Sequence, residues 1–286
     1  MTRHGKWTVA ITVQRLCLGL LAAGTSFCTA VAAENAAPWS NPGQPAHDGA
    51  AQAGVAPPTP MATQPLAAYR PKRADFDRER ASPDARHVAD WVVDSGNNQN
   101  LPFVIVDKAK ARVFVFDAGG RLRGAAPALL GLARGDDSVP GIGARKMSSM
   151  RPKERTTPAG RFVAALGRNY SGKDILWVDY DTAISLHRVV SSNAGERRAL
   201  RLATPTPLDN RISYGCINVP VKFYEQVVTP AFTGTNGIVY VLPETRPPRE
   251  VFSSYDVEER ARLQTAQTAR QSVPMRPVLQ DGAVGH

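Results

Sequence analysis

Residues 211–220 read RISYGCINVP and place Cys216 directly after a glycine. A glycine at this position lets the backbone turn sharply toward a substrate and leaves amide N–H groups free to face a developing oxyanion. The other two cysteines, Cys17 and Cys28, lie near the N-terminus. If they leave with a signal peptide, a lone thiol remains that cannot form an internal disulfide. It is either an idle buried side chain or a nucleophile, and the Gly-Cys turn favours the nucleophile.

Residues 1–33 have the order of a secretory signal: basic residues, an apolar stretch at 16–23 and small residues at 30–33. The apolar stretch is shorter than the ~20 residues that a membrane span needs. We therefore expect cleavage, no stable membrane insertion afterwards, and a periplasmic or cell-envelope location; a retained signal anchor is the alternative. Phe27, directly before Cys28, argues against lipid attachment.

Composition divides the rest of the chain into three parts. Residues 34–86 are rich in Ala, Pro, Gln and Gly and predict a flexible tether, because they cannot bury enough apolar surface to offset the entropy of ordering. Residues 87–245 predict one folded domain, and 246–286 a charged, Pro-containing tail with a helical piece at 257–270.

Short β-branched and aromatic runs with turn residues between them predict a mainly β fold. The runs 103–106 and 112–116, around a polar turn, predict a hairpin. Other expected strands are 122–130, 161–166, 175–178, 184–187 and 238–242. Helices are expected at 88–93 and, after Pro220, at 221–228. The long segment 131–158, rich in Gly, Pro, Arg and Lys, predicts a functional loop.

The net charge of +10 becomes +7 once the three basic residues of the signal are removed (Arg3, Lys6 and Arg15). A modest positive charge favours anionic partners, and an exported protein meets the polymers of the envelope. A generic basic surface is the alternative. Since no dense basic run is interleaved with aromatic residues, we expect no nucleic-acid binding.

A thiol becomes a good nucleophile beside a base or cation. His187 ends an expected strand inside the folded domain and is the candidate base. His47 lies in the tether, His286 is the last residue, and His87 at the domain edge is expected to be structural. Side chains that could orient the imidazole are Ser185 and Asp179.

The order His187, then Ser213-x-Gly215-Cys216-Ile217-Asn218, resembles the signature of the L,D-transpeptidase (YkuD-like) catalytic domain. Residues 156–162, TTPAGRF, look like the Thr-Pro-x-Gly-x-Phe segment of that family, and the 105–116 hairpin is similar to its first hairpin. The resemblance covers roughly residues 103–242.

The resemblance implies a mainly β, sandwich- or barrel-like catalytic domain with one or two short helices, acting on peptidoglycan stem peptides without a metal or organic cofactor. Cys216 matches the nucleophile and His187 its activating base. The amides of Gly215 and Cys216 match the oxyanion hole, in a loop that also contains Ser213 and Tyr214. The implied reaction passes through a Cys216 thioester to a 3→3 cross-link or an exchanged terminal residue. Candidate substrate-binding residues are Arg188, Arg211 and Asn218.

Two features depart from the family pattern. Tyr214 stands where the family usually has histidine, and a phenol is a poor base near neutral pH; it either packs under the loop or positions substrate. Between His187 and Ser213 lie 25 residues, more than the family usually has. This segment, with Arg197 and Arg198, is either a basic lid for the anionic stem peptide or a solvated loop.

Three functions remain open at this stage. The first is the transpeptidase, and the second an L,D-carboxypeptidase or cross-link hydrolase that uses the same nucleophile. The third is a wall-binding protein without activity. The oligomeric state, the diamino acid and the acceptor are not decided by the sequence.

Overall fold

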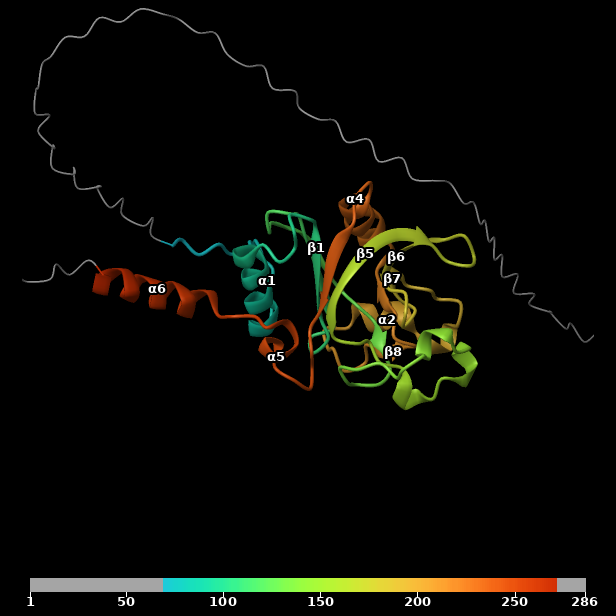
Figure 1. Ribbon diagram of the computed structural model, residues 1–286. Coiled ribbons are helices and arrows are strands. Elements are labelled where there is room, and N and C mark those ends of the chain that lie inside the picture. The colour runs from blue at the N-terminus through green and yellow to red at the C-terminus, as the bar shows by residue number, and fades with distance from the viewer. Residues whose placement is uncertain (1–68, 272–286) are drawn as a thin grey trace, which may run out of the picture. The chain divides into compact units, whose positions relative to one another are not determined.

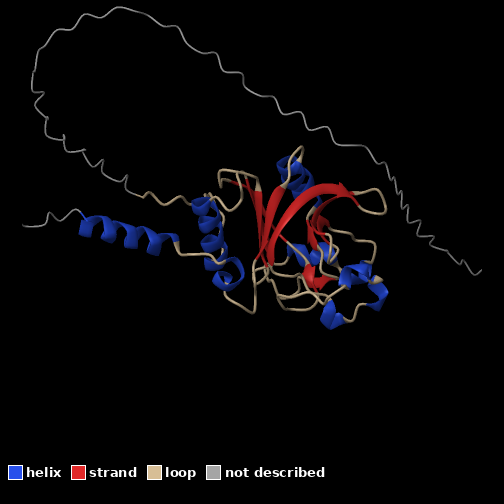
Figure 2. Cartoon of the chain, viewed as in Figure 1, coloured by secondary structure: helices blue, strands red, loops and turns tan. Residues whose placement is uncertain are grey.

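The computed structural model describes residues 69–271 (Figure 1). The expected signal, most of the expected tether and the end of the tail lie outside the described residues. Strands form the centre of the described unit, and short helices surround them (Figure 2). The mainly β fold predicted from the sequence is confirmed.

The main sheet has eight strands in the order β3-β2-β1-β10-β5-β6-β7-β9. Pairs β1–β10 and β7–β9 are parallel and the other neighbours antiparallel, so the predicted β1–β2 hairpin is confirmed. A second, two-stranded sheet pairs β4 with β8. The strands are β1 (Phe103–Asp107), β2 (Arg112–Phe116), β3 (Leu122–Pro127), β4 (Leu130–Gly131), β5 (Gly160–Arg168), β6 (Asp174–Asp179), β7 (Ile184–Arg188), β8 (Arg211–Ser213), β9 (Ile217–Val219) and β10 (Gly237–Val241).

Two apolar clusters pack on opposite faces of the sheet. In β1, Val104 and Val106 belong to one cluster, and Phe103 and Ile105 to the other. Because β1 and β10 are buried on both faces, they read as continuous apolar runs rather than alternating ones. The site described below lies at the β7–β9 edge of the first cluster.

Helix α1 (Pro83–Ser95) covers the second cluster. It begins at Ser82, whose hydroxyl accepts from the Ala85 N–H (3.1 Å), and ends at Gly96 in the left-handed region. It is longer than the 88–93 helix predicted. Buried Phe76 and Phe252 join the same cluster, so the folded unit extends beyond residues 87 and 245 on both sides.

The predicted helix after Pro220 is present and continues further. It comprises α3 (Val221–Phe223), a π-helical turn (Tyr224–Val228) and α4 (Thr229–Phe232). The predicted 257–270 helix is α6 (Val257–Gln271). The sequence did not predict α2 (Arg198–Ala203) or α5 (Pro248–Phe252). Within residues 69–271, no helix combines the length and apolar character needed to cross a membrane.

The 131–158 segment is an ordered loop. Its three 3-10 turns span Ile142–Ala144, Met147–Ser149 and Pro152–Glu154. The Glu154 carboxylate accepts from Arg145, from the Arg151 side chain and from the Arg151 N–H. These bonds hold the loop closed on itself beside the Gly-Cys turn.

Candidate active site

The turn before the cysteine requires glycine. Gly215 has φ +131°, and a Cβ there would lie 2.6 Å from Ile184 Cδ1 and 2.8 Å from the Thr156 carbonyl oxygen. The Ser213 hydroxyl spans the turn, accepting from the Gly215 N–H (3.1 Å) and donating to the Cys216 carbonyl (2.6 Å). Ser213 therefore shapes the turn, and the Gly215 amide is engaged within it.

A buried threonine fixes this turn to the neighbouring loop. Thr157 Oγ1 donates to the Gly215 carbonyl (2.7 Å) and accepts from the Gly131 N–H (2.9 Å). The side chain thus joins the 131–158 loop to the residue before the thiol. The Thr-Pro segment drew attention to this position in the sequence, but its hydrogen-bond partners come only from the fold.

Behind Thr157 lies a buried network of charges. Lys108 Nζ donates to Asp136 (2.8 Å) and to the Thr157 carbonyl (3.0 Å), and Arg211 pairs with Glu244 (2.6 Å). Burial lowers the pKa of the Lys108 ammonium, although Asp136 opposes the shift. Arg211 does not line the pocket described below, because its guanidinium is paired in this network. The sequence did not predict the network, because Lys108 reads as part of an exposed hairpin turn.

The Cys216 thiol is half-buried and close to two groups from β7 and the turn before it. Ser185 Oγ lies 3.6 Å from Sγ, and the Ala183 carbonyl oxygen lies 3.7 Å from it. Ser185, considered as a partner for the imidazole, instead contacts the thiol. Asp179 closes the β6–β7 turn by accepting from Thr182 and the Asp181 N–H, and has no contact with His187.

The His187 imidazole is oriented from two sides. β7 and β9 run parallel and place His187 beside Asn218. Nδ1 lies 2.7 Å from the Arg188 carbonyl oxygen, to which it donates, so Nε2 is the basic nitrogen of the neutral ring. Asn218 Nδ2 lies 3.5 Å from that nitrogen.

The thiol and the imidazole shift each other's pKa in opposite directions. Burial raises the pKa of the Cys216 thiol, but the neighbouring His187 imidazole outweighs burial and lowers that pKa below its ordinary value. Burial also lowers the pKa of His187, and the interaction with Cys216 outweighs it and raises that pKa. Both shifts favour a thiolate–imidazolium pair, the reactive form of a catalytic cysteine.

The thiol opens into a pocket of about 350 Å³. The segment between His187 and Ser213 supplies one wall, and Met147 of the 131–158 loop another. Arg198 donates to Asn218 Oδ1 (2.7 Å) and pairs with Glu196 (2.5 Å). The lining residues are Met147, His187, Val190, Ser192, Asn193, Glu196, Arg198, Ser213, Tyr214, Cys216 and Asn218.

Tyr214 both packs and lines this pocket. The Arg155 guanidinium lies over its ring, 4.0 Å from the centroid, and donates to the Met150 carbonyl at 3.0 and 3.2 Å. The stack fixes the ring at the pocket wall and places a positive charge on its other face.

Two other predicted positions lie elsewhere. Arg188 pairs with Asp174 (3.1 Å) and Glu225 (2.9 Å) and lies over the Tyr224 ring, so its guanidinium does not line the pocket. The His87 side chain, on helix α1, contacts the Ser254 hydroxyl (2.9 Å), in keeping with a structural role. Of the three candidate substrate-binding residues, only Asn218 lies at the site. His47 and His286 lie outside the described residues.

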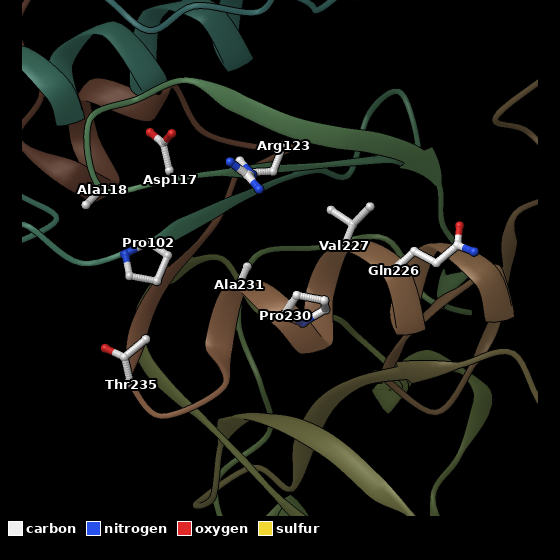
Figure 3. A pocket seen from close by; sticks show the side chains of 9 residues that line it. All are labelled: Pro102, Asp117, Ala118, Arg123, Gln226, Val227, Pro230, Ala231 and Thr235. Atoms are coloured by element: carbon white, nitrogen blue, oxygen red, sulfur yellow. The ribbon is translucent and has the colours of Figure 1, made fainter.

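Figure 3 shows a second pocket, of about 330 Å³, between the β2–β3 turn and the π-helical segment. Its one carboxylate, Asp117, accepts from the Gly119 and Arg121 N–H groups of its own turn. Neither a cysteine nor a histidine lines it. Its lining residues are Pro102, Asp117, Ala118, Arg123, Gln226, Val227, Pro230, Ala231 and Thr235. Over residues 69–271, no group of three or more His, Cys, Asp or Glu side chains could hold a metal ion.

No protein-family model and no curated protein matches the chain. Solved structures with a similar fold include the L,D-transpeptidase LdtMt1 in complex with imipenem, with 16% identity, a TM-score of 0.29, and 49% of this chain covered against 58% of that one. Another is the helical cell shape determining protein Pgp2 from Campylobacter jejuni (14%, TM-score 0.32, 59% and 70% covered). A third is an L,D-transpeptidase from Mycobacterium tuberculosis H37Rv (15%, TM-score 0.30, 49% and 57%). Likenesses this loose do not assign an activity.

Proposed function

We propose that the chain is a cysteine-dependent L,D-transpeptidase-like acyltransferase that acts on peptidoglycan stem peptides. The observation that supports this most is that Cys216 and His187 line the same open pocket, with the imidazole oriented by the Arg188 carbonyl and by Asn218. The sequence motif around Cys216 supplies the substrate class.

In the first half-reaction, the Cys216 thiolate attacks the carbonyl carbon at the L-centre of the third stem residue, a diamino acid. The new C–S bond produces a tetrahedral oxyanion. As the C–N bond to the terminal D-Ala breaks, the leaving amine takes the proton from the His187 imidazolium, and a thioester remains.

The oxyanion develops beside the 214–216 turn. We assign the Cys216 amide as its first donor, because the Gly215 amide already donates to the Ser213 hydroxyl (3.1 Å). The Gly215 amide can join only if that hydroxyl moves away during the reaction. Ser213 and Thr157 contribute to the reaction indirectly, because their hydrogen bonds fix the turn that carries Cys216.

In the second half-reaction, neutral His187 takes a proton from an acceptor amine, which attacks the thioester carbonyl. The C–S bond breaks, the thiolate returns, and a second diamino acid as acceptor gives a 3→3 cross-link. Water in place of the amine gives an L,D-carboxypeptidase or hydrolase, which is the alternative function with the same nucleophile.

We also propose that residues 1–33 are a cleaved signal, that 34–86 include a tether, and that the enzyme works in the periplasm or envelope. Arg198 belongs to the wall formed by residues 188–212. We propose that it attracts the anionic stem peptide, since it lines the pocket beside Asn218. Of Arg197 and Arg198, the two arginines considered for a basic lid, only Arg198 is given this role.

Product analysis tests the proposal. A stem tetrapeptide is incubated with the enzyme, with and without an amine acceptor, and products are identified by liquid chromatography and mass spectrometry. We expect released D-Ala and an amine-dependent cross-linked dimer, and neither with Cys216→Ala. Tripeptide and D-Ala without a cross-linked dimer, even when the amine acceptor is present, would identify the hydrolase. A folded enzyme that releases no D-Ala would support the non-catalytic wall-binding protein.

A further inference from the structure

The outer surface of the β5–β6–β7 region carries two exposed tyrosine rings and one half-buried indole ring. Trp177 and Tyr180 stack with centroids 4.6 Å apart at 23°, and Tyr180 is 68% exposed. Tyr170, in the β5–β6 loop, is fully exposed. We call these three rings the aromatic platform. They border a hollow of about 510 Å³ lined by Gly143, Gly167, Arg168, Asn169, Tyr170, Trp177, Tyr180 and Ala183.

The platform adjoins the catalytic thiol through strand register. Trp177 lies directly opposite Ser185 in the β6–β7 ladder. Directly paired residues have Cβ atoms about 5 Å apart on the same face. Ser185 Oγ in turn lies 3.6 Å from Cys216 Sγ. Ala183 links the two sites as well: it lines the hollow, and its carbonyl oxygen lies 3.7 Å from the thiol.

Close backbone approaches build this surface. Trp177 lies flat over Gly167, where a Cβ would be 2.8 Å from Trp177 Cδ1. Gly143 of the 131–158 loop meets the β6–β7 turn, where a Cβ would lie 2.4 Å from the Asp181 carbonyl oxygen. Two separate glycines thus allow the platform to form beside the loop that borders the active site.

The chemistry of the hollow indicates its ligand. Its lining includes no carboxylate and a single cation, Arg168, which donates to the Gly172 carbonyl (3.2 Å). A diamino acid side chain would therefore find no counter-charge there. Trp and Tyr present an apolar face with a polar tip. A pyranose ring offers the complement, an apolar C–H face bordered by hydroxyl and amide groups.

We propose that the aromatic platform binds the glycan strand that carries the donor stem peptide, through N-acetylated amino-sugar rings stacked on Tyr180 and Tyr170. This inference rests on the proposed function, since it extends the substrate from the stem peptide to the sugars beside it. With the glycan held there, the attached peptide reaches Cys216 across Ser185 and Ala183.

Sugar binding is tested first without catalysis. Full-length Cys216→Ala protein is titrated with a tetramer of N-acetylglucosamine, and the Trp177 indole N–H resonance, assigned with Trp177→Phe, is followed by NMR. We expect a saturable shift of that resonance, and about two- to tenfold weaker binding with Tyr180→Ala, since loss of one aromatic stack is of that size. Leu263→Ala, an equally exposed position on α6, is the control. No shift, or equal binding by Tyr180→Ala, would overturn the proposal.

Kinetics test the link to the active site. The ratio of kcat/KM for a disaccharide-tetrapeptide donor to kcat/KM for the free tetrapeptide should be about two to ten in the wild type and approach one in Tyr180→Ala. A ratio that Tyr180→Ala leaves unchanged would refute the link. If neither donor reacts while the sugar still binds, the proposed acyl transfer fails and the sugar site stands, so the two failures are distinguishable.

Discussion

Replacing His187 with glutamine should convert Cys216 from an ionised nucleophile into an ordinary buried thiol. Glutamine keeps a donor for the Arg188 carbonyl, which His187 Nδ1 contacts at 2.7 Å. It cannot carry the positive charge that lowers the pKa of the thiol. In the variant, burial raises that pKa, and only the weaker contacts with Ser185 oppose it. The thiolate should then form only at alkaline pH.

The size of the effect follows from the ionised fraction. A thiol with an unperturbed pKa of about 8.5 is roughly 3% thiolate at pH 7, so full ionisation is worth up to about thirtyfold in rate. A thiolate of lower pKa is also a weaker nucleophile, with a Brønsted exponent of about 0.4–0.5, which reduces the gain to roughly threefold. Because burial raises the pKa of the variant's thiol further, we expect His187→Gln to alkylate at least about three times more slowly at pH 7.

The assay is the rate of iodoacetamide reaction at Cys216 between pH 5 and 9.5, followed by peptide mass spectrometry so that Cys17 and Cys28 do not contribute. The wild-type rate should level off below the ordinary thiol pKa, while the rate of His187→Gln should keep rising above it. His87→Gln, which removes a histidine bonded to Ser254, is the matched control. Identical pH profiles for wild type and His187→Gln would refute the ion pair.

Three further substitutions test the supports of the site. Thr157→Val should lower the free energy of unfolding by about 1–3 kcal/mol in urea unfolding, because it leaves two buried backbone groups unpaired, and it should also slow donor turnover. Thr157→Ser keeps the hydroxyl and should restore both stability and turnover; if it does not, the role of the hydroxyl is refuted. Lys108→Met should cost about 3–5 kcal/mol in the same unfolding measurement, since Asp136 loses its buried partner, and a loss below 1 kcal/mol would contradict the buried network. Arg198→Glu should raise the donor KM several-fold, whereas Arg197→Glu, outside the pocket, should not; equal KM values would remove Arg198 from substrate binding.

The strands and the turn that carries Cys216 could be predicted from the sequence because local pattern determines them. β-branched runs such as 103–106 form strands wherever they are buried, and Gly215 before Cys216 encodes a turn whose backbone angle excludes other residues. The 184–187 run correctly placed His187 in a strand, which continues to Arg188, although its pairing with β9 required the fold.

Long-range partners account for what the sequence did not predict. Arg211 lies five residues before the thiol in the chain, yet Glu244 draws its guanidinium into the buried network. Arg188 follows the base directly and pairs with Asp174 and Glu225. The aromatic platform depends on the register that sets Trp177 opposite Ser185, and a shift of one residue would turn that ring to the core.

Residues 188–212 form one wall of the pocket. Residues between His187 and Ser213 form an ordered wall in which Arg198 bonds Asn218, and Asn218 lies beside the imidazole. Tyr214, held by Arg155, completes the opposite side. A rigid wall of this kind favours one donor geometry and places the Arg198–Glu196 ion pair within the pocket.

The central claim, that Cys216 is an acylated nucleophile, is tested most directly by trapping the acyl-enzyme. The full-length protein is incubated with a carbapenem, whose ring carbonyl forms a stable thioester with a reactive cysteine, and the intact mass and the peptide map are measured. We predict a mass increase of one carbapenem located on Cys216, and none in folded Cys216→Ala. A folded wild-type protein that gains no mass, or that carries the adduct on another residue, would contradict the account.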